Sequence, residues 1–375
     1  MRIVTVVGTR PQLIKAAALS PSLRERHEEV LVDTGQHYDD QLAGSFYREL
    51  ALPPPDHALG VGGGTHAEQT AAMLAGLEPI LIDREPDAVL IYGDTNSTLA
   101  GALVAAKLGI PVAHVEAGLR SFDRRMPEEV NRVVADHLSR WLFAPTPTAV
   151  VNLRAEGIVD GVSLVGDLMQ DLAARVGREV MDEAVLQEVS ARLAVTIPGL
   201  DLRPGGYLFA TIHRAENREP AALRAWSALL DRVASPDRPV VLAIHPGTRL
   251  ALEREAIGLS RHVLLVDPLG YRTSLALQLH AAAVLTDSGG IQREAAWLGV
   301  PCVVLRGTTE WVEAVVDSGG RMVVVGLDAE VAVKALDRLA PVDRAPELAR
   351  SRARSFNLAP AGASAAIVAA LEPGP

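Results

Sequence analysis

The sequence predicts an α/β protein with two doubly wound parallel sheets, and three observations lead to this prediction. Apolar, strand-like runs alternate with longer helical segments along the whole chain. These runs are continuous in Val, Ile and Leu, which is typical of parallel strands that helices cover on both faces. The chain has 375 residues, more than a single core of ordinary size accommodates, so we expect two domains.

The first half contains strand-like runs at residues 2–8, 29–34, 87–93, 110–116, 141–146 and 162–166. Helical segments separate them, most clearly at residues 67–85 and 97–109. The second half repeats the pattern with runs at residues 207–213, 239–246, 262–268, 282–287, 300–306 and 321–326. Strands that alternate with helices in this way indicate βαβ units, and therefore a doubly wound sheet in each half.

The predicted change of domain lies near residues 166–180, where a long helical segment leaves the sixth run. The Pro- and Gly-rich residues 197–206 then lead into the second sheet. We expect a first domain at residues 1–168 and a second at 169–360. Residues 361–375 are expected to form a C-terminal helix that is a candidate to return to the first domain.

Composition and charge exclude several classes of protein. The formal net charge of −10 at pH 7 argues against nucleic-acid or membrane-surface partners. The single cysteine, Cys302, lies in an apolar run; it excludes an internal disulfide framework and is expected to be a small core residue. The N-terminus lacks a signal-peptide pattern, and no apolar run reaches the roughly 18 residues of a membrane span. We therefore expect a cytoplasmic globular protein.

Polar residues mark the ends of the predicted strands. Nearly every strand-like run ends in Gly, Asp, His, Arg or Glu. Ligands of doubly wound sheets bind beyond the carboxyl ends of the strands. Two such sheets with polar ends facing each other predict one active-site cleft between the domains.

The first strand-to-helix turn, within GTRPQLIK at residues 8–15, has the composition of an anion site. Gly8 ends the strand-like run, and Pro11 stands in the first turn of the following helix. The N–H groups of a helix start attract anions, and Arg10 is placed to add a bidentate phosphate contact. An ordinary turn with a surface arginine explains this segment equally well.

The segment TDSGGIQREAAWLG, at residues 286–299, repeats this arrangement in the second half. Ser288, Gly289 and Gly290 open a helix whose N–H groups can hold a diphosphate together with the hydroxyl. Glu294 follows within the first turns and suits the ribose hydroxyls of a nucleotide. The chain lacks GxxxxGK[ST], which excludes a P-loop ATPase. It also lacks GxGxxG after the first strand, which disfavours a dinucleotide cofactor.

Three carboxylates and one histidine lie after predicted strands: Asp94, Glu116, Glu128 and His213. Taken singly, Asp94 fits a helix cap and Glu128 fits a helix start. Together they offer proton acceptors and a donor, as the removal of a proton next to a leaving phosphate requires. For His245 a nucleotide contact and a structural role both stay open. No HExxH motif or Cys cluster is present, so we expect no metal.

Seven motifs, in this order, resemble those of the UDP-N-acetylglucosamine 2-epimerases: GTRPQLIK, GDTNST, HVEAGLRSFDRRMPEEVNR, TIHRAENRE, DPLGY, TDSGGIQREA and LRGTTEWVEA. The resemblance covers essentially the whole chain. It implies a GT-B type fold of two Rossmann-like domains and a homodimer. It also implies reversible conversion of UDP-GlcNAc to UDP-ManNAc, in which the C2 proton and UDP are lost to give 2-acetamidoglucal. No cofactor is implied.

The resemblance assigns roles by position. Asp94, Glu116, Glu128 and His213 match the catalytic set. Glu116 and Glu128 are expected to transfer protons, Asp94 to tune or share that role, and His213 to donate to the departing diphosphate. The UDP-holding positions match Arg10, Ser288, Gly289, Gly290 and Glu294, and we add Lys15, Arg214 and His245 as candidates for binding the UDP-sugar. Arg120 is expected to orient Glu116 and Glu128.

The chain departs from the best-known bacterial members at several positions. Gln12 replaces a glutamate, Trp311 and Val312 replace the Arg-Pro of a TTERPE motif, and Ala72 stands where an arginine helps to hold an allosteric UDP-GlcNAc. These departures resemble a branch that includes archaeal enzymes and epimerases of UDP-2,3-diacetamido sugars. A diacetamido-sugar epimerase, a hydrolysing epimerase that releases ManNAc and UDP, and a GT-B glycosyltransferase therefore remain alternatives. The three carboxylates favour epimerisation over transfer.

Overall fold

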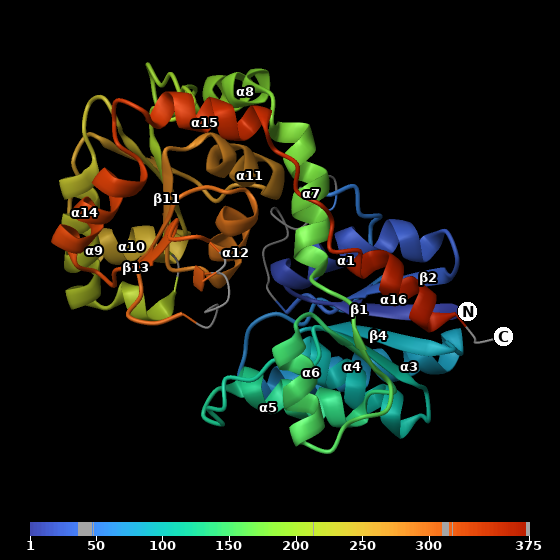
Figure 1. The fold of residues 1–375 in the computed structure, drawn as a ribbon. Helices are drawn as coiled ribbons and strands as arrows, with labels where there is room; N and C mark the ends of the chain where they lie inside the picture. Colours follow the sequence, from blue (N-terminus) through green and yellow to red (C-terminus); the bar gives the residue numbers. More distant parts are fainter. Residues whose placement is uncertain (37–46, 48, 213, 310–314, 317, 373–375) are drawn as a thin grey trace. The chain divides into compact units, whose positions relative to one another are not determined.

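The computed structural model describes residues 1–36, 47, 49–212, 214–309, 315–316 and 318–372 (Figure 1). The chain divides into two compact units. Unit 1 comprises Met1–Leu172 and Ala359–Pro375, and unit 2 comprises Ala173–Leu358. Each unit holds one parallel sheet, which confirms the predicted fold class. Within the described ranges, no helix combines the length and apolar character that crossing a membrane requires.

The sheet of unit 1 has the order β3-β2-β1-β4-β5-β6-β7, and all neighbouring strands in it are parallel. Its strands are β1 (Arg2–Val7), β2 (Glu28–Asp33), β3 (His57–Ala58), β4 (Ala88–Tyr92), β5 (Val112–Val115), β6 (Trp141–Ala144) and β7 (Val162–Leu164). The sequence pattern did not predict β3, because a strand of two residues carries no detectable periodicity.

Helices cover both faces of this sheet. They are α1 (Arg10–Arg24), α3 (His66–Arg84), α4 (Asn96–Lys107), α5 (Pro127–Leu138), α6 (Pro147–Ala155) and α16 (Ala363–Leu371), and α7 (Leu168–Val180) leads out of the unit. Helices α3, α4 and α5 pack side by side on one face, and α1 and α16 pack together on the other (Figure 1). On α3, Met73, Leu77 and Leu81 recur every fourth residue and are buried, which explains its position against the sheet.

The sheet of unit 2 has the order β10-β9-β8-β11-β12-β13 and is also parallel. Its strands are β8 (Leu208–Ile212), β9 (Val240–Ile244), β10 (Val263–Val266), β11 (Ala283–Thr286), β12 (Cys302–Val304) and β13 (Met322–Val324). Its helices are α8 (Glu183–Leu193), α9 (Pro220–Val233), α10 (Pro246–Arg254), α11 (Tyr271–His280), α12 (Gly289–Trp297), α14 (Ala329–Leu339) and α15 (Ala345–Arg354), with a short 3-10 helix, η1 (Ala215–Arg218). The strand order reverses between β8 and β11, so the loops that follow these two strands lie at the same edge of the sheet.

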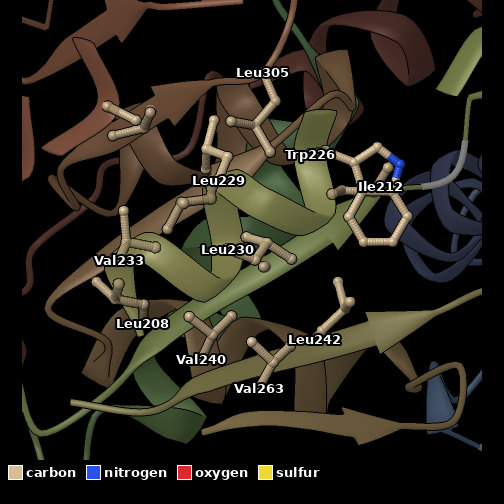
Figure 2. Packing of buried hydrophobic residues seen from close by; sticks show 14 of the residues in the cluster. Leu208, Ile212, Trp226, Leu229, Leu230, Val233, Val240, Leu242, Val263 and Leu305 are labelled. Carbon is tan, nitrogen blue, oxygen red and sulfur yellow. The ribbon is translucent and has the colours of Figure 1, made fainter. Parts of the chain in front are cut away.

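The core of unit 2 lies between α9 and the strands beneath it. Trp226, Leu230 and Val233 follow one another at helical spacing and lie over β8, the strand that runs from Leu208 to Ile212 (Figure 2). Burial of such apolar surface stabilises the unit by about 25 cal/mol per Å². This packing stabilises the sheet whose strands carry the candidate binding loops at their carboxyl ends.

Cys302 is buried in β12, as predicted. Burial raises the pKa of its thiol to about 12, so almost no reactive thiolate forms near neutral pH. We expect the native protein to resist iodoacetamide at pH 8 and to be alkylated once it is unfolded in guanidinium. Mass spectrometry counts the adduct. Rapid alkylation of the native protein would contradict the burial of this residue.

The C-terminal helix α16 belongs to unit 1. The carboxylate of Asp171 accepts the backbone N–H groups of Gly362 and Ser364, each at 2.9 Å. The Ser364 hydroxyl donates to the carbonyl of Ala18 on α1 at 3.1 Å. These bonds fix the start of α16 against α1, because a helix start otherwise leaves its N–H groups unpaired.

We expect Asp171→Ala to lower the free energy of unfolding by about 1 kcal/mol, since both N–H groups at the start of α16 lose their acceptor. Denaturant titration followed by circular dichroism measures the change. Asp160→Ala is the matched control, because Asp160 is an exposed residue of the same unit. An unchanged midpoint for Asp171→Ala would show that α16 does not depend on this cap.

Candidate functional site

The turn between β1 and α1 leaves no room for a side chain at its first residue. A Cβ atom on Gly8 would lie 2.0 Å from Thr34 Oγ1 and 2.3 Å from Ser97 Oγ. These two hydroxyls are hydrogen-bonded to each other at 2.8 Å. The turn therefore packs tightly against the first turn of α4. Arg10, a predicted phosphate contact, is exposed at the start of α1.

Gln12 ties the start of α1 to the end of β4. Its side-chain oxygen accepts the N–H of Thr9 at 3.2 Å, and its nitrogen donates to the carbonyl of Tyr92 at 2.8 Å. The glutamine amide can both accept and donate, whereas an ionised carboxylate at this position would have no proton to donate to the carbonyl. Gln12 thus has a structural role that depends on its side-chain amide, because it links the start of α1 to the end of β4.

Lys15 and Glu116 form an ion pair that is largely shielded from solvent. The Lys15 ammonium contacts Glu116 Oε2, and the two side chains are 9% and 14% exposed. Glu116 has a φ of +73°, a left-handed conformation that costs a non-glycine residue about 1 kcal/mol or more. Its N–H donates to the carbonyl of Phe143 at 3.1 Å. The loop after β5 therefore turns sharply at the residue predicted to transfer a proton.

Asp94 follows β4 and pairs with Arg132 of α5. Arg132 also reaches Glu129 at 2.8 Å, and Asn131 donates its side-chain amide to the carbonyl of Asp94 at 2.9 Å. Burial disfavours the charged guanidinium, but Asp94 and Glu129 outweigh burial and raise the pKa of Arg132. Arg132 thus stays cationic beside Asp94. Sequence reasoning missed this residue, although its spacing from Glu129 on a helix was a usable signal.

Glu128 and Glu129 are adjacent in the sequence but differ in their surroundings. Glu128 is exposed in the first turn of α5. Glu129 is 2% exposed and accepts the N–H groups of Ser121 and Phe122, both at 2.9 Å. Burial alone would raise the pKa of Glu129, but these bonds and Arg132 lower it. Glu129 therefore holds the loop before α5, and Glu128 remains the accessible carboxylate.

Arg120 does not have the expected partners. We predicted that it orients Glu116 and Glu128, but its buried guanidinium pairs with Asp136 and Glu156, each at 2.7 Å. Burial opposes its charge, and the two carboxylates still raise its pKa. Arg120 therefore belongs to the packing between α5 and α6.

In unit 2, β11 ends at a buried aspartate that organises the neighbouring loop. Asp287 Oδ2 accepts the N–H of Arg214 at 3.0 Å and the side-chain amide of Asn217 at 2.7 Å. The Arg214 guanidinium donates to the carbonyl of Asp287 at 3.2 Å. Ser288 then caps α12 by accepting the N–H of Ile291 at 3.5 Å. The predicted binding residues Arg214 and Ser288 are thus brought to one edge of the sheet.

The remaining predicted binding residues of unit 2 lie on α12 and α10. Gly289 and Gly290 open α12, and a Cβ on Gly290 would approach only Ser288 Oγ, at 3.7 Å. Glu294 is buried in the same helix and accepts the side-chain amide of Gln278 at 2.7 Å. His245 caps α10, where its Nδ1 accepts the N–H of Gly247 at 3.1 Å.

Three predicted positions lie outside the described residues: His213, Trp311 and Val312. Among the residues that the structure does describe, no group of three His, Cys, Asp or Glu side chains is arranged to hold a metal ion. In unit 1, the predicted catalytic carboxylates are thus those of two carboxylate–cation pairs, Glu116 with Lys15 and Asp94 with Arg132, and the exposed carboxylate of Glu128.

Comparison with known proteins places this chain in a family. The UDP-N-acetylglucosamine 2-epimerase family model matches residues 22–372. A UDP-N-acetylglucosamine 2-epimerase homolog of Methanococcus maripaludis is 43% identical over 345 residues, which cover 91% of this chain and 93% of that protein. The UDP-2,3-diacetamido-2,3-dideoxy-D-glucuronate 2-epimerase of Pseudomonas aeruginosa is also 43% identical, over 340 residues that cover 89% of this chain and 91% of that protein.

A solved structure extends the similarity to the fold. The Methanocaldococcus jannaschii UDP-GlcNAc 2-epimerase in complex with UDP-GlcNAc and UDP superposes with a TM-score of 0.80 at 35% identity, and the match covers 99% of both chains. This similarity confirms the predicted GT-B type of fold, with two parallel-sheet units. The chain therefore belongs to the UDP-N-acetylglucosamine 2-epimerase family.

Proposed function

We propose that this chain reversibly epimerises C2 of a UDP-N-acetylated hexosamine, with UDP-GlcNAc and UDP-ManNAc as the first pair to test. One observation carries the proposal. In a chain of this family, the loops after the neighbouring strands β4 and β5 each present a carboxylate held by a cation, Asp94 by Arg132 and Glu116 by Lys15. Such carboxylates suit the removal of a carbon-bound proton.

The proposed reaction begins when a carboxylate takes the C2 proton. The electron pair of the C2–H bond becomes the C1=C2 double bond, and UDP leaves C1 with the electrons of the C1–O bond. The products of this step are 2-acetamidoglucal and UDP. In the return step a UDP oxygen adds to C1 while a proton is delivered to the opposite face of C2, so no hydride acceptor is needed.

We assign the two proton transfers to Glu116 and Glu128, and a tuning or sharing role to Asp94. Lys15 and Arg132 reduce the net negative charge of the carboxylates, so that they do not repel the incoming diphosphate. A proton acceptor is needed on each face of C2, because inversion removes the proton from one side and returns it to the other. Glu116 lies at the turn after β5 and Glu128 in the first turn of α5, and this placement on two different elements supports the division.

The nucleotide is assigned to unit 2. We propose that the start of α12, with Ser288, Gly289 and Gly290, holds the diphosphate through N–H groups. Glu294, oriented by Gln278, is assigned to the ribose. Arg214 and His213 are assigned to the diphosphate, with His213 as the donor to the departing UDP; Arg10 and His245 are further candidates for contacts to UDP.

A second substrate class has specific support. The Pseudomonas aeruginosa relative, named as acting on a UDP-2,3-diacetamido-2,3-dideoxy-D-glucuronate, is as similar to this chain as the Methanococcus maripaludis relative is. The elimination at C1 and C2 is the same for such a sugar, and only the contacts to C3 and C6 differ. We therefore propose UDP-2,3-diacetamido sugars as the alternative substrates.

Proton NMR of the purified protein with UDP-GlcNAc in D₂O tests the proposal. Deuterium at C2 together with UDP-ManNAc is the expected result. Free ManNAc and UDP would mean that water traps the intermediate, as in a hydrolysing epimerase. Exchange only with a UDP-2,3-diacetamido sugar would establish the alternative substrate. A folded protein that exchanges C2 in neither substrate would overturn the proposal.

We also propose a homodimer, which the resemblance supports, and a cytoplasmic location, which the single cysteine and the sequence pattern of the N-terminus support. Size-exclusion chromatography with light scattering measures the mass directly. A mass near 39.8 kDa at micromolar concentration would contradict the dimer.

A further inference from the structure

A buried histidine–aspartate pair lies next to the loops that carry Asp94 and Glu116. It consists of His114 on β5 and Asp136 near the end of α5, whose side chains are both 0% exposed. His114 Nδ1 lies 2.7 Å from Asp136 Oδ1, and His114 Nε2 lies 2.7 Å from the carbonyl oxygen of Gly93. The pair is not part of the proposed chemistry, although burying charge is costly.

The partners determine the protons on the imidazole ring. The carbonyl of Gly93 can only accept, so His114 Nε2 must donate to it. Asp136 accepts on its other oxygen from the Gly118 N–H at 3.1 Å and from Arg120 Nη1 at 2.7 Å. Burial would raise the pKa of Asp136, but His114 and Arg120 lower it. The carboxylate of Asp136 is therefore ionised.

Asp136 thereby holds the turn that follows Glu116. Gly118 has a φ of +80°, and a Cβ there would lie 2.4 Å from the carbonyl oxygen of Ala149. Glu116, two residues earlier, is also left-handed. The left-handed backbone is strained at Glu116, which is not a glycine, and such strain persists only where its surroundings over-determine it. The bond from the Gly118 N–H to Asp136 is one such constraint.

His114 holds the residue immediately before Asp94. Gly93 receives the imidazole bond on its carbonyl, and its N–H donates to the carbonyl of Val115 at 3.0 Å. A Cβ on Gly93 would lie 3.3 Å from Glu116 Oε2 and 3.5 Å from Lys15 Nζ. Movement of Gly93 would therefore displace Asp94 and disturb the Glu116 ion pair together.

We propose that His114 and Asp136 are positioning residues for proton transfer, which set the mutual placement of Asp94 and Glu116 through Gly93 and Gly118. This inference rests on the proposed function, and it goes beyond that function by adding two residues that touch no substrate. The carboxylate of Asp136, on α5, is linked to both loops. It accepts the N–H of Gly118 directly, and it reaches Gly93 through His114, which lies between them.

Two substitutions of His114 separate positioning from simple packing. The amide nitrogen of Gln can take the place of Nε2 and keep the bond to Gly93, whereas that of Asn takes the place of Nδ1 and keeps only the bond to Asp136. We expect His114→Asn to lower kcat about 100-fold, since misplacement of reacting groups by about 1 Å costs that much. His114→Gln should stay within about tenfold of the native kcat, and KM should change less than about threefold in both variants.

His280 provides the matched control in unit 2. It is 1% exposed, and its Nε2 lies 2.9 Å from the carbonyl oxygen of Val180. His280→Asn should lower the melting temperature but leave kcat within about twofold of the native value. Equal kcat values for His114→Asn and His114→Gln, or losses that merely follow the melting temperature, would overturn the inference.

Amide hydrogen exchange of the full-length protein tests the same inference without activity. His114→Asn should speed exchange in residues 93–96, because this variant loses the bond to the Gly93 carbonyl, whereas His114→Gln and His280→Asn should not. Unchanged protection of residues 93–96 in His114→Asn would overturn the inference, whatever the activity. If native protein exchanges C2 in no UDP-sugar, the proposed function fails, and amide exchange still decides whether the pair holds the loops.

Discussion

Glu116→Gln is expected to abolish exchange at C2, with a fall in rate of about 10³-fold or more, because the amide cannot accept a proton at physiological pH. The glutamine side chain has the shape of the glutamate, and its carbonyl oxygen can still accept a hydrogen bond from the Lys15 ammonium that contacts Glu116. The sharp turn after β5 should therefore persist, and UDP binding should be nearly unchanged. Deuterium incorporation by NMR and UDP titration by calorimetry measure the two quantities.

Glu78→Gln is the matched control for this substitution, because Glu78 is an exposed residue of α3 in the same unit. It should keep C2 exchange within about twofold of the native rate. Normal exchange in Glu116→Gln would remove Glu116 from the mechanism. Loss of both exchange and UDP binding would instead indicate that the substitution disturbs the fold.

Arg132→Gln is expected to lower kcat about 100-fold, because Asp94 loses the cation that positions it and Glu129 loses one of its buried partners. Removal of one partner of a buried ion pair leaves the other charge uncompensated. The effect should differ from that of a surface change: Arg154→Gln, on the exposed side of α6, should leave kcat within about twofold of the native value.

A double-mutant cycle identifies the cause of the Arg132 effect. If Arg132 acts through Asp94, then Asp94→Asn and Arg132→Gln should be non-additive in the logarithm of kcat, with a coupling of about 1 kcal/mol or more. Steady-state kinetics of the four proteins give this coupling. Additive losses would mean that Arg132 acts through Glu129 and the loop before α5 instead.

Much of the fold follows from local pattern. The continuous apolar runs identified the strands of both sheets except β3, and the segments between them identified helices such as α3 and α4 to within one or two residues. This succeeds because parallel strands are buried on both faces and so remain apolar throughout. The short β3 has no such signal, since its pairing depends on β2 rather than on its own residues.

The site was only partly predictable from the sequence. Motif positions singled out Asp94 and Glu116, and both lie at the carboxyl ends of neighbouring strands. The cation that pairs with Asp94 was missed, and the partners predicted for Arg120 were wrong. A charged side chain can pair with a partner tens of residues away along the chain, and the sequence does not say which candidate partner lies nearest in space.

By itself, the sequence determined the α/β class, the alternation of strands and helices, and the residue types available at each strand end. These depend on burial and backbone propensity, which are local properties. Tertiary structure decided which of the adjacent Glu128 and Glu129 is exposed and which is a buried anchor. The left-handed turn at Glu116 likewise depends on distant groups, because its strain is offset only by contacts that the folded chain brings together.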